Sequence, residues 1–347
     1  MEYGMGIVGT GLIAELHARA IAEAEGVRLV SVLSRSQERA AAFADRHGCT
    51  GFCAAREFFD DPRLDIVSIC TPPGTHLEPA LQAIASGKHA VIEKPLEITL
   101  RGCDAIIEAA GRKGVRVSGI FQSRFHDSVR VVKQGLDEGR FGRLILGDAC
   151  VKWFRSQEYY DKGGWKGMKL YEAGALMNQA IHAIDLLQWF MGPVSSVHAF
   201  ADTLGHERLD VEDTAVAALR FTDGSCGAIE ASTAVYPGFK KKIEISGTKG
   251  SAIIEEEDLK FWQFDPARPG DEAIRRDYGQ KTRTGGGAAD PAAIGSHGHR
   301  RQFEEFAAAL RENRPPIVDA VEARKSVAII LAIYKSVRTG KPVRPEA

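Results

Sequence analysis

Residues 3–14 read Tyr3-Gly4-Met5-Gly6-Ile7-Val8-Gly9-Thr10-Gly11-Leu12-Ile13-Ala14. The apolar run over 3–8 predicts a strand, and the pattern G-x-G-x-x-A between this strand and a helical segment is typical of a dinucleotide-binding turn. Gly9 permits the tight turn, Gly11 lets the backbone approach a pyrophosphate, and Ala14 allows helix and strand to pack closely. We therefore predict that the residues of this turn bind a dinucleotide: Gly9, Thr10, Gly11, Leu12 and Ile13. A glycine-rich turn without a ligand is the alternative.

The end of the second predicted strand bears on which dinucleotide is bound. NAD specificity usually requires a carboxylate there, which holds the ribose hydroxyls, but the sequence reads Leu33-Ser34-Arg35-Ser36-Gln37-Glu38-Arg39. Ser34 can hydrogen-bond a 2′-phosphate, and Arg35 or Arg39 can neutralise it. The sequence therefore favours NADP modestly over NAD. In the alternative interpretation these arginines are simply solvated at the start of a helix.

The first part of the chain alternates short β-branched runs with helical patterns, which is typical of a parallel sheet with helices on both faces. The predicted strands are 3–8, 28–33, 65–70, 89–92 and 115–120, and the predicted helices are 12–24, 37–46, 78–86 and 100–113. Thr99 is predicted to cap the last of these helices. We therefore predict a doubly wound α/β domain over residues 1–121.

The pattern changes in the second predicted domain, 122–347. A helix at 128–138, a strand at 144–153 and a helix at 175–191 precede strands at 214–221, 225–234, 241–246 and 252–255. Short connections such as Thr222-Asp223-Gly224 indicate an antiparallel meander rather than further βαβ units. A long polar, glycine-rich loop is expected over 266–298, followed by an amphipathic helical tail.

Composition excludes several classes of function. The chain has 347 residues, with 45 Lys and Arg against 46 Asp and Glu, so nucleic acid is a poor partner and a small neutral or anionic ligand fits better. No leader and no membrane span are expected. Six scattered cysteines indicate free thiols in a reducing cytoplasm. His297 and His299 lack further ligands at a recognisable spacing, so no metal site is predicted.

Two further motifs follow the third and fourth predicted strands, at the strand ends where doubly wound folds bind ligands. They are Cys70-Thr71-Pro72-Pro73-Gly74-Thr75-His76 and His89-Ala90-Val91-Ile92-Glu93-Lys94-Pro95. Together with the G-x-G-x-x-A turn, they resemble the glucose-fructose oxidoreductase / inositol dehydrogenase / rhizopine catabolism protein family (Gfo/Idh/MocA). The resemblance continues through 119–126, 174–185, 247–251 and 340–343. It implies a Rossmann domain followed by an α/β domain with an open, mostly antiparallel sheet.

The resemblance also implies catalytic roles. Lys94 is expected between nicotinamide and the substrate hydroxyl, where its ammonium stabilises the developing alkoxide. His182 is the expected base. Asn178 stands four residues before it, where the family usually has Asp, and an amide orients a hydroxyl but relays no proton. Asp185 is expected to be structural or to orient the imidazole. The alternatives are a solvated lysine and a core histidine.

Contacts to ligands are carried over in the same way. The expected cofactor contacts in these motifs are Thr71, Pro72, His76, Glu93 and Lys94. The expected substrate contacts are Lys94, Arg124, Trp165, Lys166, Asn178, His182 and Tyr236. For each aromatic residue of this set, packing is an equally good explanation.

The implied activity is that of a cytoplasmic NAD(P)-dependent dehydrogenase. It would transfer a hydride between nicotinamide and a hydroxyl carbon of a sugar, polyol or nucleotide-sugar derivative. A redox-neutral, NAD-dependent glycosidase that works by elimination and a non-catalytic dinucleotide-sensing protein remain open. The family also implies a homodimer or homotetramer paired through the open sheet face.

Overall fold

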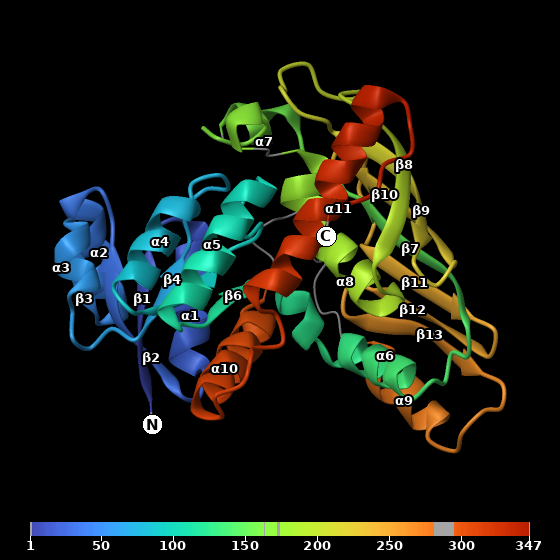
Figure 1. Cartoon of the computed structure of the whole chain (residues 1–347), viewed down its shortest axis with the longest axis horizontal. Coiled ribbons are helices and arrows are strands. Elements are labelled where there is room, and N and C mark those ends of the chain that lie inside the picture. Colours follow the sequence, from blue (N-terminus) through green and yellow to red (C-terminus); the bar gives the residue numbers. More distant parts are fainter. Residues whose placement is uncertain (1, 163, 172–173, 281–294, 347) are drawn as a thin grey trace. The chain divides into compact units, whose positions relative to one another are not determined.

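The computed structural model describes residues 2–162, 164–171, 174–280 and 295–346. It divides into two compact units (Figure 1). Unit 1 consists of Met1–Gln122 and Gly295–Arg324, and unit 2 consists of Ser123–Ile294 and Lys325–Ala347. Helix α11 (Ala320–Thr339) contributes residues to both.

Unit 1 is built on a parallel sheet of six strands in the order β3-β2-β1-β4-β5-β6. The strands are β1 (Tyr3–Val8), β2 (Val27–Leu33), β3 (Thr50–Phe52), β4 (Ile66–Ile69), β5 (His89–Ile92) and β6 (Val117–Gly119). The order reverses between β1 and β4. Because parallel crossovers are right-handed, the helices of the two halves cover opposite faces. This reversal is the point where doubly wound sheets bind ligands, at the carboxyl ends of the strands.

Four helices of unit 1 match the predicted ones closely. They are α1 (Leu12–Glu23), α2 (Gln37–His47), α4 (Leu77–Ala85) and α5 (Leu100–Lys113), and a short fifth helix is α3 (Ala55–Phe59). The predicted cap of α5 is confirmed, since the Thr99 hydroxyl accepts a hydrogen bond from the Gly102 amide at 3.0 Å. The short elements β3 and α3 were not predicted, because three to five residues are too few for a periodic pattern.

Helix α10 (His297–Arg311) belongs to unit 1, although it comes late in the chain. It packs against α1, and its Phe303 and Phe306 lie in one buried cluster with Met5 and Ile7 of β1. The sequence division at residue 121 placed this segment in the second domain. The structure differs because burial of the aromatic side chains, rather than chain order, decides which core a helix joins.

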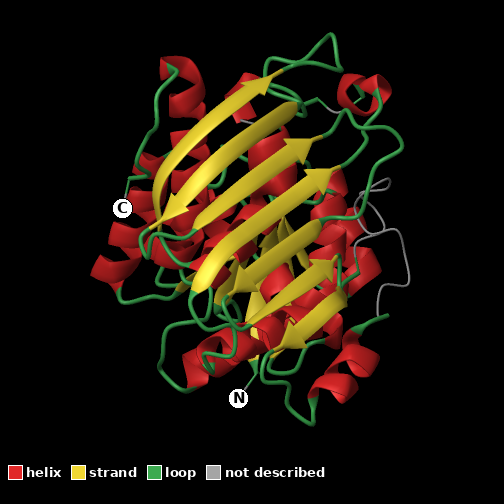
Figure 2. Cartoon of the chain, turned by 90° about the vertical axis from the view of Figure 1, so that its right-hand side faces the viewer, coloured by secondary structure: helices red, strands yellow, loops and turns green. Residues whose placement is uncertain are grey.

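Unit 2 is built on a sheet of seven strands in the order β13-β12-β11-β7-β10-β9-β8 (Figure 2). The strands are β7 (Leu144–Lys152), β8 (Val194–Asp202), β9 (Thr214–Phe221), β10 (Cys226–Ser232), β11 (Lys242–Gly247), β12 (Gly250–Glu255) and β13 (Asp258–Phe264). Only β7 and β10 pair in parallel, so the sheet is mostly antiparallel, as the resemblance implied. Strands β8 and β13 were not predicted.

One face of this sheet is covered and the other is open. Helices α6 (Asp127–Asp137) and α8 (Ile181–Met191) pack on the covered face. Along β9 the side chains alternate between the two faces, so Ala217 and Leu219 are buried while Val216 is 50 % exposed. Figure 2 shows the open face toward the viewer.

Three features of unit 2 refine the sequence prediction. The helix expected over 175–191 has a π-helical first part, η3 (Ala175–Ala180), before α8 begins. The expected loop over 266–298 contains α9 (Asp271–Tyr278), while its residues 281–294 lie outside the described part of the chain. Short helices α7 (Gln157–Asp161), η1 (Gln122–Phe125) and η2 (Lys169–Tyr171) complete the elements.

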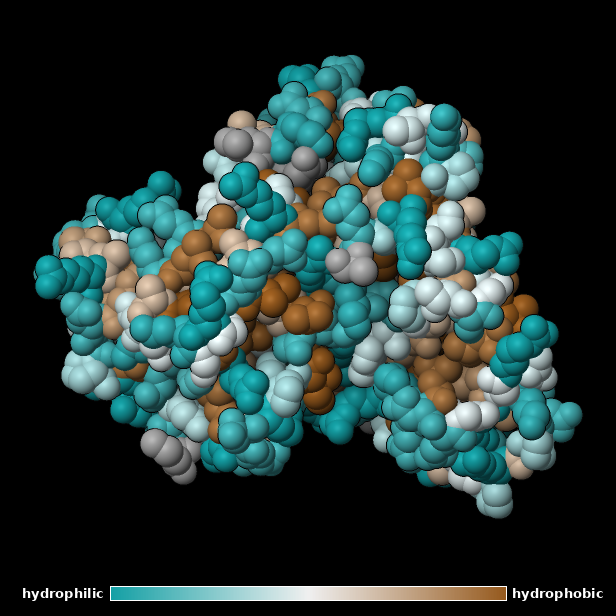
Figure 3. Space-filling view, viewed as in Figure 1, coloured by the Kyte–Doolittle hydropathy of each residue, from teal (hydrophilic) through white to brown (hydrophobic). Residues whose placement is uncertain are grey.

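The surface and the thiols agree with the composition. Hydrophilic side chains cover much of the face shown in Figure 3. None of the helices in the described residues is long and apolar enough to cross a membrane. All six cysteines carry free thiols.

Candidate functional site

The turn between β1 and α1 has the geometry that a dinucleotide requires. Gly9 has a φ of 113°, and a Cβ at this position would lie 2.9 Å from the Cys70 carbonyl oxygen. Gly11 is the N-cap residue of α1, and no side chain there caps the first amides of the helix. A Cβ at Gly11 would meet no atom within 4 Å. The first amides of α1 are therefore open to a pyrophosphate, which suits a helix N-terminus. Thr10 and Ile13 are partly buried and Leu12 is exposed.

The end of β2 presents hydroxyl and guanidinium groups. The Ser34 hydroxyl accepts a hydrogen bond from the Ser36 amide at 3.3 Å and lies 3.5 Å from the Thr10 hydroxyl. Arg35 and Arg39 are exposed. In the described part of the chain neither arginine forms an ion pair with a carboxylate. This corner of unit 1 therefore offers positive charge beside a hydroxyl, at the end of β2.

His76 joins the loops that follow β4 and β5. Its imidazole is fully buried, and its nitrogens lie 2.8 Å from the Pro95 carbonyl oxygen and 2.9 Å from the Thr71 carbonyl oxygen. Both ring nitrogens thus contact backbone oxygens within the protein, so the ring holds the two loops together. Pro72 is partly buried in the first loop, and the Lys94–Pro95 peptide bond in the second loop is cis.

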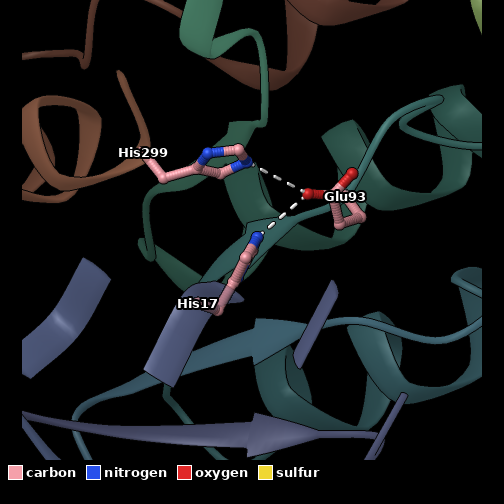
Figure 4. Close-up of side chains that lie close together, drawn as sticks. All are labelled: His17, Glu93 and His299. Carbon is pink, nitrogen blue, oxygen red and sulfur yellow. Dashed lines mark hydrogen bonds and ion pairs between the residues drawn. The ribbon is translucent and has the colours of Figure 1, made fainter. Parts of the chain in front are cut away.

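His17, Glu93 and His299 form a buried cluster (Figure 4), and Glu93 directly precedes Lys94 in the chain. Glu93 Oε1 is 2.9 Å from His17 Nε2 of α1 and 3.6 Å from His299 Nε2 of α10. Glu93 Oε2 accepts a hydrogen bond from the Lys94 amide at 3.0 Å. The three residues of the cluster are 0 to 5 % exposed. Glu93, predicted as a cofactor contact, therefore has both oxygens engaged inside the protein.

The charges of this cluster depend on one another. Burial lowers the pKa of His17, but the Cys70 thiol and the Glu93 carboxylate outweigh it and raise that pKa to about 10. Burial raises the pKa of Glu93, yet the bonds from His17 and His299 hold it well below its usual range. Burial also lowers the pKa of His299 and of Lys94. These interactions favour the protonated form of His17, the carboxylate form of Glu93 and the neutral form of His299.

Sequence reasoning did not single out His17, and it considered His299 only as a metal ligand and set it aside. Each is a histidine on the buried side of an amphipathic helix, which by itself indicates packing. Only the fold brings α1 and α10 to the same carboxylate. No spacing in the sequence relates residues 17, 93 and 299.

In unit 2, Asn178 and His182 lie where η3 passes into α8. Asn178 is 7 % exposed, and its backbone N–H donates a hydrogen bond to the Gly174 carbonyl oxygen at 3.1 Å. His182 is partly buried in the first turn of α8. A π turn contains more residues than an α turn, so positions four apart stay close to one face, and such turns are frequent at functional sites.

Glu212 holds the start of this π helix, and it was not predicted. Its backbone oxygen and Oε1 accept hydrogen bonds from the Ala175 and Leu176 amides at 3.0 and 2.8 Å. Its Oε1 also accepts from the Tyr334 hydroxyl at 3.0 Å. A Cβ at residue 174 would lie 2.3 Å from the Glu212 carboxylate, so a larger residue there would displace this carboxylate from its hydrogen bonds.

Arg124, predicted as a substrate contact, is instead part of a buried ion pair. Its Nε and Nη2 donate to the two Asp185 oxygens at 2.7 and 2.6 Å, and the paired side chains are 0 and 1 % exposed. The Arg124 guanidinium also stacks 4.7 Å from the Trp189 ring centre. Asp185 is therefore structural, which was one of its two expected roles. The reason is that a buried guanidinium requires an anion, which a short-range motif cannot reveal.

The remaining predicted substrate contacts are dispersed. The Lys166 ammonium lies 4.0 Å from the Tyr159 ring centre, and burial together with the Arg155 charge lowers its pKa. Trp165 is partly buried against Tyr171, at 6.4 Å between ring centres. Tyr236 is 78 % exposed. Lys166 thus lies in a cationic, aromatic environment, whereas Tyr236 is open to solvent.

Comparisons with known proteins agree with this geometry. Residues 3–121 match the family model for the oxidoreductase family with an NAD-binding Rossmann fold, and residues 129–253 match the GFO/IDH/MocA C-terminal domain. Levoglucosan dehydrogenase from Pseudarthrobacter phenanthrenivorans is 30% identical, over 79% of this chain and 78% of that protein. Myo-inositol 2-dehydrogenase from Thermotoga maritima is 27% identical, over 72% and 75%.

A solved structure is similar over its whole length. The WlbA dehydrogenase from Bordetella pertussis, in complex with NADH and UDP-GlcNAcA, is 30% identical with a TM-score of 0.88, and both chains are covered to 100%. The two family models together span well over half of this chain. The chain therefore belongs to the GFO/IDH/MocA family of NAD-dependent dehydrogenases that act on sugars, polyols and sugar derivatives.

Proposed function

We propose that this protein oxidises a ring or chain hydroxyl of a sugar, polyol or nucleotide-sugar derivative, with Lys94 and His182 as the acid and base. The observation that carries this proposal is the position of Lys94 in unit 1. It follows β5 at the same carboxyl edge of the sheet as the Gly9–Gly11 turn after β1. Doubly wound folds bind their dinucleotide at this edge, which supports a catalytic role for Lys94.

The protein's groups then divide the work. Bound nicotinamide supplies the acceptor for the hydride that leaves the carbinol carbon. His182 takes the hydroxyl proton and passes it to water, so the carbon–oxygen bond becomes a carbonyl. The Lys94 ammonium stabilises the negative charge that develops on the oxygen. Asn178 donates or accepts a hydrogen bond without changing its charge, so it orients the substrate.

Substitution of Lys94 tests this assignment. The assay follows reduced-nicotinamide absorbance with levoglucosan, myo-inositol and a UDP-linked sugar acid as substrates. Lys94→Ala should abolish turnover while dinucleotide affinity, measured by fluorescence titration, stays close to that of the wild type. Lys113→Ala, which removes an exposed lysine of α5, is the matched control. If Lys94→Ala keeps most of the wild-type kcat, or if a glycoside releases its aglycone without net nicotinamide reduction, the proposed oxidation is wrong.

We also propose that NADP is preferred over NAD. The exposed Arg35 and Arg39 beside Ser34 support this preference, as does the lack of a carboxylate in residues 33–37. A charge-assisted hydrogen bond to a phosphate contributes about 1.5–3 kcal/mol, which is about tenfold or more in affinity. Arg35→Ala and Ser34→Asp should therefore lower the ratio of kcat/KM for NADP over NAD by about that factor. An unchanged ratio would mean that other residues recognise the ribose end.

We propose finally that the open face of the unit 2 sheet pairs with a second copy, in the cytoplasm. Phe200 and Val216 are partners in neighbouring strands and are 76 and 50 % exposed. Leu146 is 43 % exposed on the same face. Apolar side chains gathered in this way favour association. Phe200→Glu should shift the mass measured by light scattering from a dimer or tetramer to a monomer, and a monomeric wild type would contradict the proposal.

A further inference from the structure

We propose that His17 and His299 are positioning residues for Lys94, which they hold through the carboxylate of Glu93. The proposal rests on the proposed function, because it concerns the lysine that acts on the substrate hydroxyl. The histidines touch Glu93 Oε1, at 2.9 and 3.6 Å, and Glu93 Oε2 accepts a hydrogen bond from the Lys94 amide at 3.0 Å. The two carboxylate oxygens thus connect two helices to the backbone of the reactive lysine.

The geometry leaves the carboxylate little freedom. Rotation of Glu93 about its last side-chain bond would break the contact at Oε1 and the contact at Oε2 together. His17 is itself fixed, since its Nδ1 lies 2.7 Å from the Ser68 hydroxyl and its ring packs against Phe303 at 5.2 Å between ring centres. The cluster is almost free of solvent, so its charges attract each other with little screening.

The electrostatic setting of Lys94 follows from the groups packed around it. Glu93 and His299 interact with Lys94 directly. His17 on α1 and Cys70 after β4 interact with each other, and His17 also interacts with Glu93. The Glu93 anion raises the pKa of Lys94 against the effect of burial. The His17 cation partly cancels that anion. Loss of the Glu93 charge should therefore lower the pKa of Lys94, and loss of the His17 charge should raise it.

A metal site is the rival explanation for the same cluster. One ligand atom from each of His17, Glu93 and His299 lies within 4.8 Å of the others. Structural zinc, however, takes four protein ligands, and in the residues that the structure describes this group has three. Cys70 Sγ does not complete it, because it lies 3.3 Å from Nδ1 of His17, on the other side of the ring from Nε2. Both ring nitrogens of His17 are already engaged, with the Ser68 hydroxyl at 2.7 Å and with Glu93 at 2.9 Å, so His17 has no free nitrogen for a metal.

The experiment compares Glu93→Gln, His17→Gln and His299→Gln with the wild type. We expect kcat to fall by about 10- to 100-fold in Glu93→Gln and His17→Gln, the range for a misplaced catalytic group, while dinucleotide affinity is unchanged. The ammonium form of Lys94 is the active one, so activity is lost as the pH rises through its pKa. This alkaline limb of the kcat profile should move to lower pH in Glu93→Gln and to higher pH in His17→Gln. His299→Gln, at the longer contact, should lower kcat less.

A second measurement is independent of turnover. The pKa of Lys94 is followed by NMR of reductively ¹³C-methylated lysines, with the signal assigned by its loss in Lys94→Arg. It should show the same opposite displacements in the two variants, even if the substrate panel contains no substrate. Phe303→Leu, which alters the packing of His17 without touching a hydrogen bond, is the control. It should lower the melting temperature and leave the pKa of Lys94 unchanged.

The outcomes separate this proposal from the proposed function. Glu93→Gln and His17→Gln could lose stability as Phe303→Leu does and yet leave unchanged both the pKa of Lys94 and the alkaline limb of the kcat profile. In that case the cluster is merely structural and the proposal is overturned. Equimolar zinc in the purified enzyme, with activity lost on chelation, overturns it in favour of a metal site. If Lys94→Ala remains active, the proposed function fails, whatever the cluster does to the pKa of Lys94.

Discussion

The buried ion pair of Arg124 and Asp185 should be a main source of stability in unit 2. Replacing Arg124 by Met removes two hydrogen bonds of 2.7 and 2.6 Å from a carboxylate that is 1 % exposed. The Ser326 hydroxyl at 3.3 Å remains with Asp185 but carries no charge. Loss of one partner from such a buried pair costs about 3–5 kcal/mol, because the other charge stays desolvated. We expect Arg124→Met to lower the unfolding free energy of unit 2 by this amount.

The chain offers a selective assay for this change. All four tryptophans lie in unit 2, at positions 153, 165, 189 and 262. Tryptophan fluorescence during urea unfolding therefore reports on this unit alone. Trp189 is a sensitive probe, since its ring contacts the Arg124 guanidinium. The double variant Arg124→Met/Asp185→Leu should be more stable than Arg124→Met, because it leaves no buried charge behind.

Two results would refute this reasoning. A loss below about 1 kcal/mol for Arg124→Met would place the pair in the range of exposed ion pairs. Additive losses in the double variant would mean that the two side chains do not interact energetically.

Three further predictions concern glycine geometry, a titrating carboxylate and a helix cap. Gly9→Ala should lower both the melting temperature and dinucleotide affinity, because its Cβ would meet the Cys70 carbonyl. Gly11→Ala should lower dinucleotide affinity alone. Equal melting temperatures for the two variants would contradict this prediction. Bonds from Arg140 hold the pKa of Asp271 below its usual range. Asp271→Asn should therefore lower the unfolding free energy by its full amount at pH 7, and this loss relative to the wild type should become smaller below about pH 4. A loss that does not change with pH in urea titrations would contradict this prediction. Thr99→Ala should cost about 1 kcal/mol in thermal unfolding, and no cost would show that water replaces the cap.

Local patterns predicted unit 1 well. The strands at 3–8 and 89–92 and the helix at 100–113 agree with β1, β5 and α5 to the residue, because each carries an apolar period and a recognisable end signal. The same kind of signal predicted β9 over Thr214–Phe221. Strand β8 was missed, although residues paired with it in β9 were recognised, because the adjacent Ser195 and Ser196, at an irregularity in the pairing, and the exposed apolar Phe200 interrupt the polar–apolar alternation.

Where the motif residues lie in the fold was predictable from the sequence, but which distant residues they contact was not. Gly9 and Lys94 stand in short contiguous signatures, so their place at the sheet edge follows from the sequence alone. Glu93 was recognised in the same motif, but its partners were not. Arg124 was assigned to substrate because a motif shows which residue is present and not which carboxylate pairs with it.

By itself, the sequence determined the doubly wound architecture, the dinucleotide turn and the identity of the lysine after β5. Each depends on residues within about one helix or strand, where periodicity and turn chemistry act over short range. Only the tertiary structure decided that α10 joins the core of unit 1, that His17 and His299 meet Glu93, and that Glu212 holds the π helix. Those contacts join residues tens to hundreds of positions apart. They arise from burial and charge pairing in three dimensions, which leave no period in the chain.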